Sequence, residues 1–287
     1  MSLLFLHAMN IIGVVTTYFP DLKKLQANIS TYLEQLDFLF IWENTPKEKS
    51  RVADFFKGQE KIIIRTTGDN EVIAKDLNTI AQWAIGHGYE YVLTMDQDSS
   101  FSPGDFPKYL EIVSQNDRDD IGLWTPAYKN IKSAELLDKE ITMTSGSIVK
   151  TSVLQTCGFF SEELFIDLVD SEYCFRIRNK HYRIVQVSPI VLNHQLGYKK
   201  VNRWGIVTIN YSALRTYYIV RNWFLVYRQY PEQLLAACGP KRKFYTYTLF
   251  YRTIKIILFE DHKISKLKAL FLGVYHGLCG RGGKVYH

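Results

Sequence analysis

The first hundred residues of the chain contain four short apolar runs, and stretches with helical periodicity lie between them. The runs are continuous and rich in β-branched residues, so they predict buried strands at residues 10–16, 38–42, 62–65 and 91–95. Apolar residues between 71 and 86 are spaced as in an amphipathic helix. Strands that alternate with helices are typical of an α/β fold with a mostly parallel sheet. In such a sheet, ligands bind beyond the carboxyl ends of the strands.

The alternation becomes less regular after residue 100. The pattern there predicts a strand at 121–125, a strand containing a glycine at 142–149, a helix at 170–180 and short strands at 183–187 and 190–193. From residue 206 the periodicity is helical, with breaks near Pro231 and Pro240. We therefore expect an α/β domain over residues 9–204 and a helical C-terminal extension over residues 205–287.

Charge divides the chain at about the same place. Residues 1–198 carry 19 basic and 26 acidic residues, whereas residues 199–287 carry 16 basic and 3 acidic residues together with 17 of the 41 aromatic residues. An acidic body with a basic, aromatic tail suggests two separate tasks. The tail is suited to an anionic acceptor, a membrane surface or the interface of a homo-oligomer. A nucleic-acid-binding module is the weaker alternative, because no zinc spacing or nucleic-acid recognition signature accompanies the charge.

The rest of the composition favours a cytoplasmic protein. The four cysteines lack the spacing of a zinc site or a disulfide framework, which favours a reducing compartment. No stretch reaches the roughly 18 uncharged apolar residues of a spanning helix; residues 244–259 come nearest, but Arg252 and Lys255 interrupt them. The N-terminus shows no signal peptide, and Met9 is an alternative start. Peripheral contact with the inner face of a membrane remains compatible with this pattern.

Asp96 and Asp98 directly follow the predicted strand at 91–95. Carboxylates two residues apart at the end of a buried strand are suited to Mg2+ or Mn2+, which take oxygen ligands and share them with substrate phosphates. The alternative is a solvated turn, because aspartate is common in turns. His194 also follows an apolar strand and is a candidate third ligand, although a lone histidine in such a place is more often structural.

A second acidic segment contains Asp167, Asp170 and Glu172, just before and within the predicted helix at 170–180. A carboxylate near a helix N-terminus stays ionised in the field of the helix dipole and can act as a general base. Helix capping by an acidic first turn is the alternative. Asn70 and Asn78 are likewise suited either to capping or to binding a ligand.

These segments occur in an order that resembles glycosyltransferase family 2 and, within it, the bacterial rhamnosyltransferases that use dTDP-L-rhamnose. The resemblance covers about residues 10–230. It rests on residues 14–20, Glu43-Asn44, Asn70, Asn78, Asp96-Gln97-Asp98-Ser99, residues 144–147, 165–176 and 194–197, and the Tyr-Tyr-x-x-Arg-Asn pattern within 215–222. Val72 and Ile80 stand where the family has glycine after its two asparagines.

The resemblance implies a GT-A fold and an inverting, metal-dependent transfer of a sugar. The expected donor is dTDP-rhamnose, the acceptor is a saccharide or lipid-linked saccharide of bacterial cell-surface polysaccharide synthesis, and the cofactor is Mg2+ or Mn2+. It implies donor-nucleotide contacts at Thr17, Tyr18, Glu43, Asn44, Asn70, Asn78 and Asp96, metal ligands at Asp96, Asp98 and His194, acceptor or sugar contacts at Ser145, Gly146, Asp167 and Glu172, and the catalytic base at Asp170.

Two alternatives to the rhamnosyl donor remain open from the sequence. The first is the same family with a UDP-sugar as the donor. The second is a nucleotidyltransferase, which also combines a sheet, a metal and phosphates. That class normally has a glycine-rich basic loop after its first strand, and residues 16–21 do not form one.

Overall fold

The computed structural model describes residues 9–129, 135–194, 200–201, 207–208 and 210–285. The chain forms two compact units. The first contains Met1–Phe160 and Arg176–Gln195, and the second contains Ser161–Phe175 and Leu196–His287. The expected domain boundary, between residues 204 and 205, lies outside the described residues. The acidic segment before residue 176 belongs to the second unit, together with the C-terminal helices.

The first unit begins with the predicted alternation of strands and helices. Its elements are β1 (Ile11–Thr17), α1 (Leu22–Ile29), η1 (Leu33–Gln35), β2 (Leu39–Glu43), α2 (Val52–Phe55), β3 (Ile62–Thr66), α3 (Ile73–Gly86), β4 (Tyr91–Asp96), β5 (Ser99–Phe101), α4 (Asp105–Asn116), β6 (Ile121–Ala127), β7 (Leu136–Lys139), β8 (Ser147–Lys150), α5 (Thr151–Cys157) and β9 (Arg183–His194). The four predicted strands and the helix predicted at 71–86 are confirmed, with ends that differ by one or two residues.

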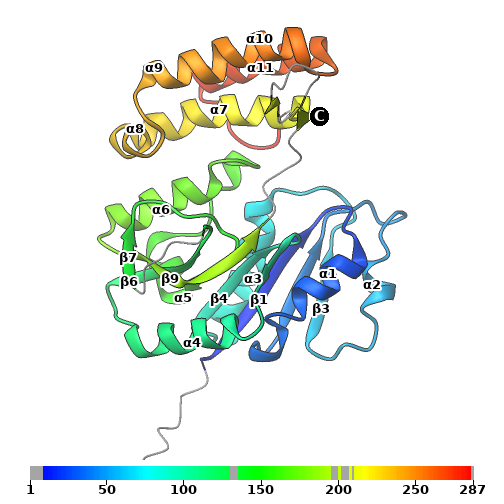
Figure 1. Ribbon diagram of the computed structural model, residues 1–287, viewed down its shortest axis with the longest axis vertical. Coiled ribbons are helices and arrows are strands. Elements are labelled where there is room, and N and C mark those ends of the chain that lie inside the picture. Colours follow the sequence, from blue (N-terminus) through cyan, green and yellow to red (C-terminus); the bar gives the residue numbers. More distant parts are fainter. Residues whose placement is uncertain (1–8, 130–134, 195–199, 202–206, 209, 286–287) are drawn as a thin grey trace, which may run out of the picture. The chain divides into compact units, whose positions relative to one another are not determined.

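The strands form one sheet in the order β3-β2-β1-β4-β8-β6-β9-β5, and β7 pairs with the other part of β9. The pairs among β3, β2, β1 and β4 are parallel, as is the pair of β6 with β9 (Figure 1). β8 runs antiparallel to both of its neighbours, β4 and β6. The expected α/β fold is therefore confirmed, and its parallel strands are those that carry the candidate nucleotide site.

Apolar side chains on both faces of the sheet explain why its strands are continuous apolar runs. Ile11 and Val15 of β1 belong to a core cluster that also contains side chains of α1, α2 and α4. Ile12 is fully buried but points to the other face, where Phe40 of β2 packs on Trp83 of α3 with ring centroids 4.8 Å apart. Helices thus cover both faces, as is usual for parallel strands.

Two predictions for the later strands were wrong in their bounds. The strand expected at 142–149 is only β8, because Gly146 has a φ of +79° and turns the chain just before it. The strands expected at 183–187 and 190–193 are one long strand, β9. The first part of β9 pairs with β6 and β7 and its end pairs with β5, with a register shift between them. This change of partners interrupts the apolar pattern without ending the strand.

The second unit is mostly helical, which confirms the expected helical C-terminal part. Its elements are η2 (Glu162–Leu164), the start of α6 (Val169–Asn179), β10 (Lys200–Val201), β11 (Val207–Thr208), α7 (Ala213–Gln229), α8 (Pro231–Cys238), α9 (Lys241–Lys243), the π-helix η3 (Phe244–Tyr251), α10 (Arg252–Phe259) and α11 (Lys263–Cys279). Among the described residues, no helix has the length and apolarity needed to cross a membrane.

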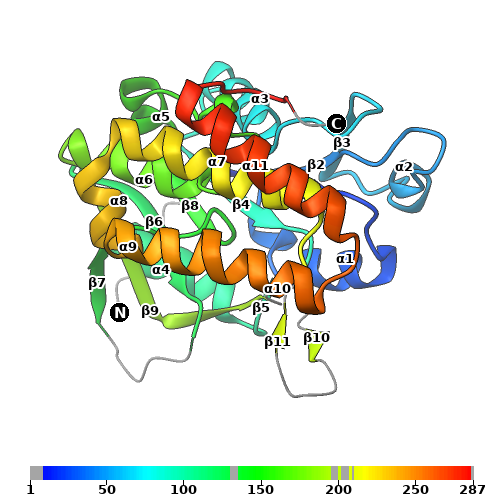
Figure 2. The ribbon, with the colours of Figure 1, turned by 90° about the horizontal axis from the view of Figure 1, so that it is seen from above.

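α7 and α11 pack closely along their lengths (Figure 2). Glycines of α11 make this approach feasible. A Cβ atom at Gly273 would lie 2.8 Å from the carbonyl oxygen of Tyr217, and one at Gly277 would lie 2.8 Å from the ring of Phe224. α11 therefore presents a narrow face of small residues to α7, and its larger side chains lie on its other faces.

Candidate active site

The carboxyl ends of β1, β2 and β4 lie side by side and carry polar residues that the sequence predicted there. Thr17 is the register partner of Glu43, and Thr16 is the register partner of Asp96. Thr17 is buried and donates a hydrogen bond to the carbonyl oxygen of Trp42 (3.3 Å). Parallel pairing thus brings donor-site candidates from three strands to one edge of the sheet, where this class of fold binds ligands.

Asp96, Asp98 and His194 come together as the sequence predicted. Each offers one potential ligand atom, and these atoms all lie within 4.8 Å of one another. Asp96 ends β4 and His194 ends β9. The antiparallel pairing of β5 with β9 sets Ser99 opposite His194 and brings His194 Nδ1 within 3.4 Å of Asp98 Oδ1. Sheet pairing, rather than sequence proximity, therefore assembles the group.

The group has the chemistry and the spacing that a divalent cation needs. Metal–oxygen distances of about 2.0–2.4 Å allow two ligand atoms on one ion to lie about 4–5 Å apart. The hydrogen bond with Asp98 raises the pKa of His194, burial opposes this, and the charges of Asp98 and Asp96 raise the pKa further. A bound cation would replace the proton that this arrangement favours. Asp96, Asp98 and His194 can therefore hold an ion such as Mg2+ or Mn2+.

Two buried serines connect this group to the sheet. Ser145 Oγ accepts a hydrogen bond from the backbone N–H of Asp96 (3.1 Å) and donates one to Ser99 Oγ (2.8 Å). Ser99 Oγ in turn lies 2.8 Å from His194 Nδ1. Ser145, expected at the acceptor or the sugar, is thus placed to support the metal group. Ser99 is missing from the predicted site residues, although it is the fourth residue of the Asp-Gln-Asp-Ser motif.

Gln97, between the two aspartates, fixes the loop after β1. Its side-chain oxygen accepts a hydrogen bond from the backbone N–H of Tyr18 (2.7 Å), and its side-chain nitrogen donates to the Tyr18 carbonyl oxygen (3.2 Å). Tyr18 is 47% exposed, and its ring packs edge-on against that of Phe19, which is 51% exposed. These rings offer an aromatic surface on the loop that Gln97 holds. Gln97 and Phe19 are further site candidates that the sequence-based prediction omitted.

Glu43 carries a buried carboxylate whose hydrogen bonding is incomplete. The residue is 1% exposed. One carboxylate oxygen accepts a hydrogen bond from the backbone N–H of Thr45 (2.8 Å), and the other has no partner among the described residues. A buried acceptor without a donor costs about 1–3 kcal/mol. The free oxygen is therefore a candidate acceptor for a donor group on a bound ligand.

Two of the three asparagines expected at the nucleotide, Asn44 and Asn78, have internal partners. Asn44 donates to a carboxylate oxygen of Asp76 (2.6 Å) and accepts from the backbone N–H of Glu71 (3.3 Å). The amide of Asn78 pairs with both the N–H and the carbonyl oxygen of Phe160, each at 2.9 Å. Both side chains thus hold neighbouring loops together. A direct contact of either one with the nucleotide stays a prediction.

Asn70 and Gly146 lie in loops near strand ends. Helix α3 has Val72 as its N-cap, so Asn70 does not cap it. Gly146 has a positive φ, and a Cβ atom there would lie 2.8 Å from the ring of Pro126. The backbone conformation and the close packing therefore require glycine at this position. Contacts of Asn70 with the donor and of Gly146 with the sugar or acceptor stay predictions.

In the second unit, the backbone of the acidic segment has an uncommon conformation. Phe165, Asp167 and Leu168 have φ values of +62°, +65° and +62°. Residues other than glycine rarely adopt this region, and such strain persists only where the surrounding structure holds it. Strain of this kind concentrates at functional sites, so the side chains that hold this segment are candidates for a functional role.

Two consecutive side chains of α7, those of Arg221 and Asn222, hold the strained segment, and both are fully buried. The amide of Asn222 donates to three carbonyl oxygens, those of Leu164, Ile166 and Asp167 (2.7, 2.7 and 2.8 Å). Arg221 donates to the Asn222 side-chain oxygen from Nε and Nη2 (2.9 and 2.7 Å) and so orients the amide. This part of the basic, aromatic segment therefore faces inward, and the sequence-based prediction missed its role.

The carboxylates of Asp167 and Asp170 differ in their partners. Asp167 forms an ion pair with Arg215 (3.0 Å). Burial raises the pKa of Asp167, and the charge and hydrogen bonds of Arg215 lower it. Asp170 accepts a hydrogen bond from the backbone N–H of Ser171 (2.8 Å). Burial raises the pKa of Asp170, the Ser171 N–H opposes the shift, and the charge of Asp167 adds to it. Asp170 thus has the environment of a proton acceptor whose pKa lies above the ordinary range.

Glu172 completes the acidic group of the second unit. It is buried, and the hydroxyl of Tyr230 donates to its carboxylate (3.3 Å). This hydrogen bond ties the first turn of α6 to the end of α7. A contact between Glu172 and an acceptor stays a prediction.

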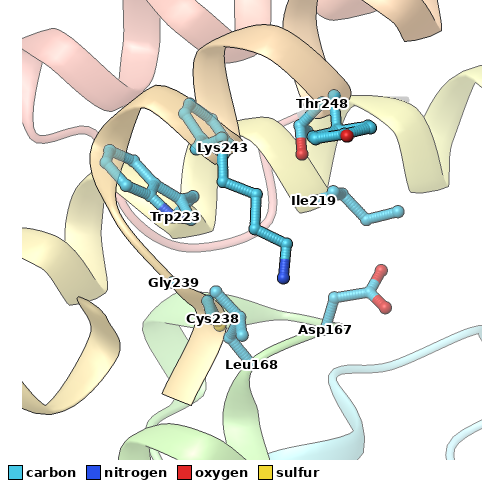
Figure 3. A pocket seen from close by; sticks show the side chains of 10 residues that line it. Asp167, Leu168, Ile219, Trp223, Cys238, Gly239, Lys243 and Thr248 are labelled. Carbon is cyan, nitrogen blue, oxygen red and sulfur yellow. The ribbon is translucent and has the colours of Figure 1, made fainter. Parts of the chain in front are cut away.

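A pocket with a volume of about 310 Å3 adjoins the strained segment within the second unit (Figure 3). Its walls are mainly apolar, and Asp167 and Lys243 supply opposite charges. The complete lining is Asp167, Leu168, Ile219, Trp223, Cys238, Gly239, Lys243, Phe244, Tyr247 and Thr248. The mixture of aromatic walls and a few polar groups is typical of a ligand site.

Comparison with known proteins assigns the chain to a family. Residues 15–163 match the family described as Glycosyl transferase family 2. Over 304 residues the chain is 31% identical to the dTDP-rhamnosyl transferase RfbF of Shigella flexneri, and the match covers 97% of this chain and 99% of that protein.

The solved structures that are similar share the fold. The chain is similar to TarS of S. aureus, with a TM-score of 0.56 and 12% identity over 93% of this chain and 81% of that chain. It is also similar to the mannosyltransferase PcManGT from Pyrobaculum calidifontis, solved in complex with GDP-Man and Mn2+, with a TM-score of 0.56 and 12% identity over 94% and 87% of the two chains. These likenesses confirm the expected GT-A fold. Because the family match spans more than half of the chain and the relative aligns with nearly all of it, this chain belongs to glycosyltransferase family 2.

Proposed function

We propose that this enzyme transfers L-rhamnose from dTDP-rhamnose to a hydroxyl group of a saccharide acceptor, with inversion at the anomeric carbon. The observation that carries the proposal is the end-to-end likeness to a dTDP-rhamnosyl transferase. Cell-surface polysaccharide synthesis is the process in which we expect the transfer to occur. The solved complex of a relative with GDP-Man and Mn2+ supports the use of a nucleotide-sugar and a divalent metal.

The first unit supplies the donor site in this proposal. Asp96, Asp98 and His194 would hold Mg2+ or Mn2+, and the ion would neutralise charge that develops on the departing diphosphate. Ser99 keeps His194 in place, and the nucleobase lies against the Tyr18 ring with its N3–H directed to Glu43. The exposed ring and the unpartnered oxygen support these two contacts.

Asp170 is the general base in this proposal. Its carboxylate takes the proton of the acceptor hydroxyl while that oxygen forms a bond to the anomeric carbon. The bond between the anomeric carbon and the diphosphate breaks at the same time, and dTDP leaves with the electron pair. The raised pKa supports the role, because a stronger base takes a hydroxyl proton more readily.

The second unit also supplies acceptor contacts. In this proposal Asp167 and Glu172 contact the acceptor, and the part of the acceptor away from the reacting hydroxyl occupies the pocket beside Asp167. The apolar lining of that pocket and the charge of Lys243 support this assignment. Aromatic walls are suited to the apolar faces of a sugar ring, and Lys243 is suited to a phosphate. These features support either a free saccharide or one carried on a lipid diphosphate.

Thermal unfolding with dTDP, UDP, GDP and CDP, each with and without Mn2+, tests the donor side. A ligand that binds only the folded protein raises the midpoint by mass action. We expect the largest metal-dependent shift with dTDP. If UDP gives the largest shift, the family assignment stands and the donor is a UDP-sugar instead. If no nucleotide shifts the midpoint, the donor and metal roles proposed for these residues are contradicted.

The products separate the proposed activity from nucleotidyl transfer. Rhamnosyl transfer from dTDP-rhamnose releases dTDP, and nucleotidyl transfer between a sugar phosphate and dTTP releases pyrophosphate. Formation of dTDP together with a rhamnosylated saccharide is the expected result. Release of pyrophosphate from dTTP, without rhamnosyl transfer, would contradict the proposal.

A further inference from the structure

Helix α11 carries a row of large apolar side chains exposed to solvent. Ile264, Phe271, Tyr275 and Leu278 are 86%, 69%, 56% and 57% exposed. With the exposed Lys268 they recur at intervals of four and three residues, so they lie on one side of the helix. We call these five residues the outer row of α11.

The outer row lies opposite the face of α11 that packs on α7. The buried residues of α11 are Lys266, Ala269, Gly273 and Gly277. At 100° per residue, these four positions are centred about half a turn away from the outer row. The outer row therefore points away from α7 and is not needed to hold the two helices together.

The preceding helices show the same combination of exposed apolar and basic side chains. Tyr247, Tyr251 and Leu258 are exposed at intervals of four and seven residues, and the exposed Lys255 lies among them. Of the fourteen large apolar side chains that are exposed in the described part of the chain, ten lie between residues 245 and 278. The concentration of exposed apolar side chains in this one segment marks an interaction surface rather than ordinary surface variation.

The net positive charge of residues 241–285 indicates which kind of partner this surface can bind. Residues 241–285 contain ten basic residues and two acidic ones, Glu260 and Asp261. Glu260 is buried in an ion pair with Lys266 (2.8 Å), and Asp261 accepts a hydrogen bond from Asn210 (3.0 Å). A second copy of the chain would bring a surface of the same sign against this one. An anionic lipid surface would instead neutralise the lysines and bury the apolar rows.

We propose that η3, α10 and α11 form a docking surface for an anionic lipid bilayer, on which the helices lie in the interface without spanning it. Tyrosine rings favour the headgroup region, and lysine side chains extend from apolar surfaces toward lipid phosphates. The inference goes beyond the proposed sugar transfer, since docking requires neither donor nor metal. It would concentrate the enzyme where an acceptor on a lipid diphosphate is found.

Vesicle co-sedimentation of the full chain tests the proposal. We expect binding to vesicles of phosphatidylcholine with phosphatidylglycerol, weakening as salt rises, and little binding to phosphatidylcholine alone. The triple variant Ile264→Gln, Phe271→Gln, Leu278→Gln should lose about 10-fold or more of this binding. A control with Phe55→Gln and Leu136→Gln removes exposed apolar side chains of the first unit and should bind as the wild type does.

A second variant tests the same surface independently, in case the apolar triple variant does not fold. Lys255→Gln, Lys263→Gln and Lys268→Gln change only exposed side chains and should also lose about 10-fold or more of the binding. Absent binding of the wild type, or undiminished binding of both variants, would overturn the proposal. Light scattering that finds a wild-type dimer and a monomeric apolar variant, without vesicle binding, would assign the surface to a second copy instead. The dTDP experiment is independent, so failure here leaves the proposed transfer untouched.

Discussion

The side-chain amide of Asn222 donates a hydrogen bond to the backbone carbonyl oxygen of Asp167 across 2.8 Å. Asp167 has a φ of +65°, and its carboxylate is held by Arg215, also from α7. One helix thus fixes both the backbone and the side chain of a residue three positions before Asp170. Within the part of the chain that the structure describes, the hydrogen bonds of Asn222 reach Leu164, Ile166 and Asp167 but not Asp170. Asn222 would therefore act on the proposed base by positioning the segment that carries it.

Replacing Asn222 with alanine should lower turnover more than donor binding. The change removes the donor shared by three carbonyl oxygens and releases the strained segment that leads to Asp170. We expect a loss of about 2–4 kcal/mol in the free energy of unfolding. Misplacement of the base should reduce kcat about 10- to 100-fold. Denaturant unfolding and steady-state kinetics measure the two effects, and dTDP affinity should remain unchanged.

Asn116→Ala is the matched control for Asn222→Ala. Asn116 is exposed near the end of α4, where its amide donates to the carbonyl oxygen of Ile112 (2.8 Å). This change should leave both kcat and stability close to those of the wild type. If Asn222→Ala lowers stability while kcat in the remaining folded protein is unchanged, Asn222 has only a structural role.

Replacing Asp170 with asparagine should remove the proposed base and preserve the fold. General-base catalysis contributes about 100- to 10,000-fold, so kcat should fall by a factor in that range. The midpoint of thermal unfolding at neutral pH should not fall, because the change removes a charge together with its desolvation cost. The metal-dependent shift with dTDP should also be preserved. Turnover like that of the wild type would exclude Asp170 as the base.

The pH dependence of the wild-type enzyme should report the raised pKa of Asp170. Only the ionised carboxylate can accept a proton, so kcat/KM should rise with pH along a limb whose midpoint lies above the ordinary carboxyl pKa of about 3.9. The free energy of unfolding should change with pH in the direction opposite to kcat/KM. A carboxyl whose pKa is higher in the folded protein than in the unfolded protein stabilises the fold at low pH, and this contribution is lost as pH rises through the folded pKa. Unfolding of Asp170→Asn should therefore lack this loss.

The parts of the site that lie within one segment were predictable from the sequence. Asp96 and Asp98 follow a continuous apolar strand, and the chemistry of paired carboxylates does not depend on distant contacts. The strands themselves were predictable because burial on both faces requires continuous apolar runs. The approach of His194 to Asp98 depends instead on the antiparallel pairing of β5 and β9, which no local pattern signals.

The second unit shows where sequence reasoning fails. Three residues with positive φ values, Phe165, Asp167 and Leu168, have no glycine among them to signal the turn. Their conformation is imposed by Asn222, more than fifty positions later in the chain. The helical pattern around Asn222 predicted a basic, aromatic helix, but not that this side chain is fully buried and faces the acidic segment. Long-range hydrogen bonding decided both features.

Ser99 should control metal affinity through His194. Its Oγ lies 2.8 Å from the ring nitrogen of His194 and accepts from Ser145. Residues that orient a metal ligand typically affect affinity by about 10- to 100-fold. We expect Ser99→Ala to raise the Mn2+ concentration needed for half-maximal dTDP binding by about 10-fold. Ser100→Ala, the next residue on the same strand, should have little effect, and equal effects of the two changes would contradict the role of Ser99.

Glu43 should determine which nucleobase is accepted. Thymine and uracil present an N3–H donor, which suits the unpartnered oxygen of Glu43, whereas cytosine presents an N3 acceptor. In Glu43→Gln, the amide oxygen must stay on the side of the Thr45 N–H, because that donor needs an acceptor. The amide nitrogen then takes the position of the free oxygen and offers a donor where the base also has one.

The expected result is therefore a change of preference rather than a uniform loss. The affinity of Glu43→Gln for dTDP should fall about 10-fold or more, and its affinity for CDP should rise. Calorimetry with both nucleotides in the presence of Mn2+ measures the ratio. Glu48→Gln, an exposed change a few residues later, should keep the wild-type ratio. An unchanged ratio in Glu43→Gln would place the nucleobase elsewhere, and the buried oxygen would then need another donor.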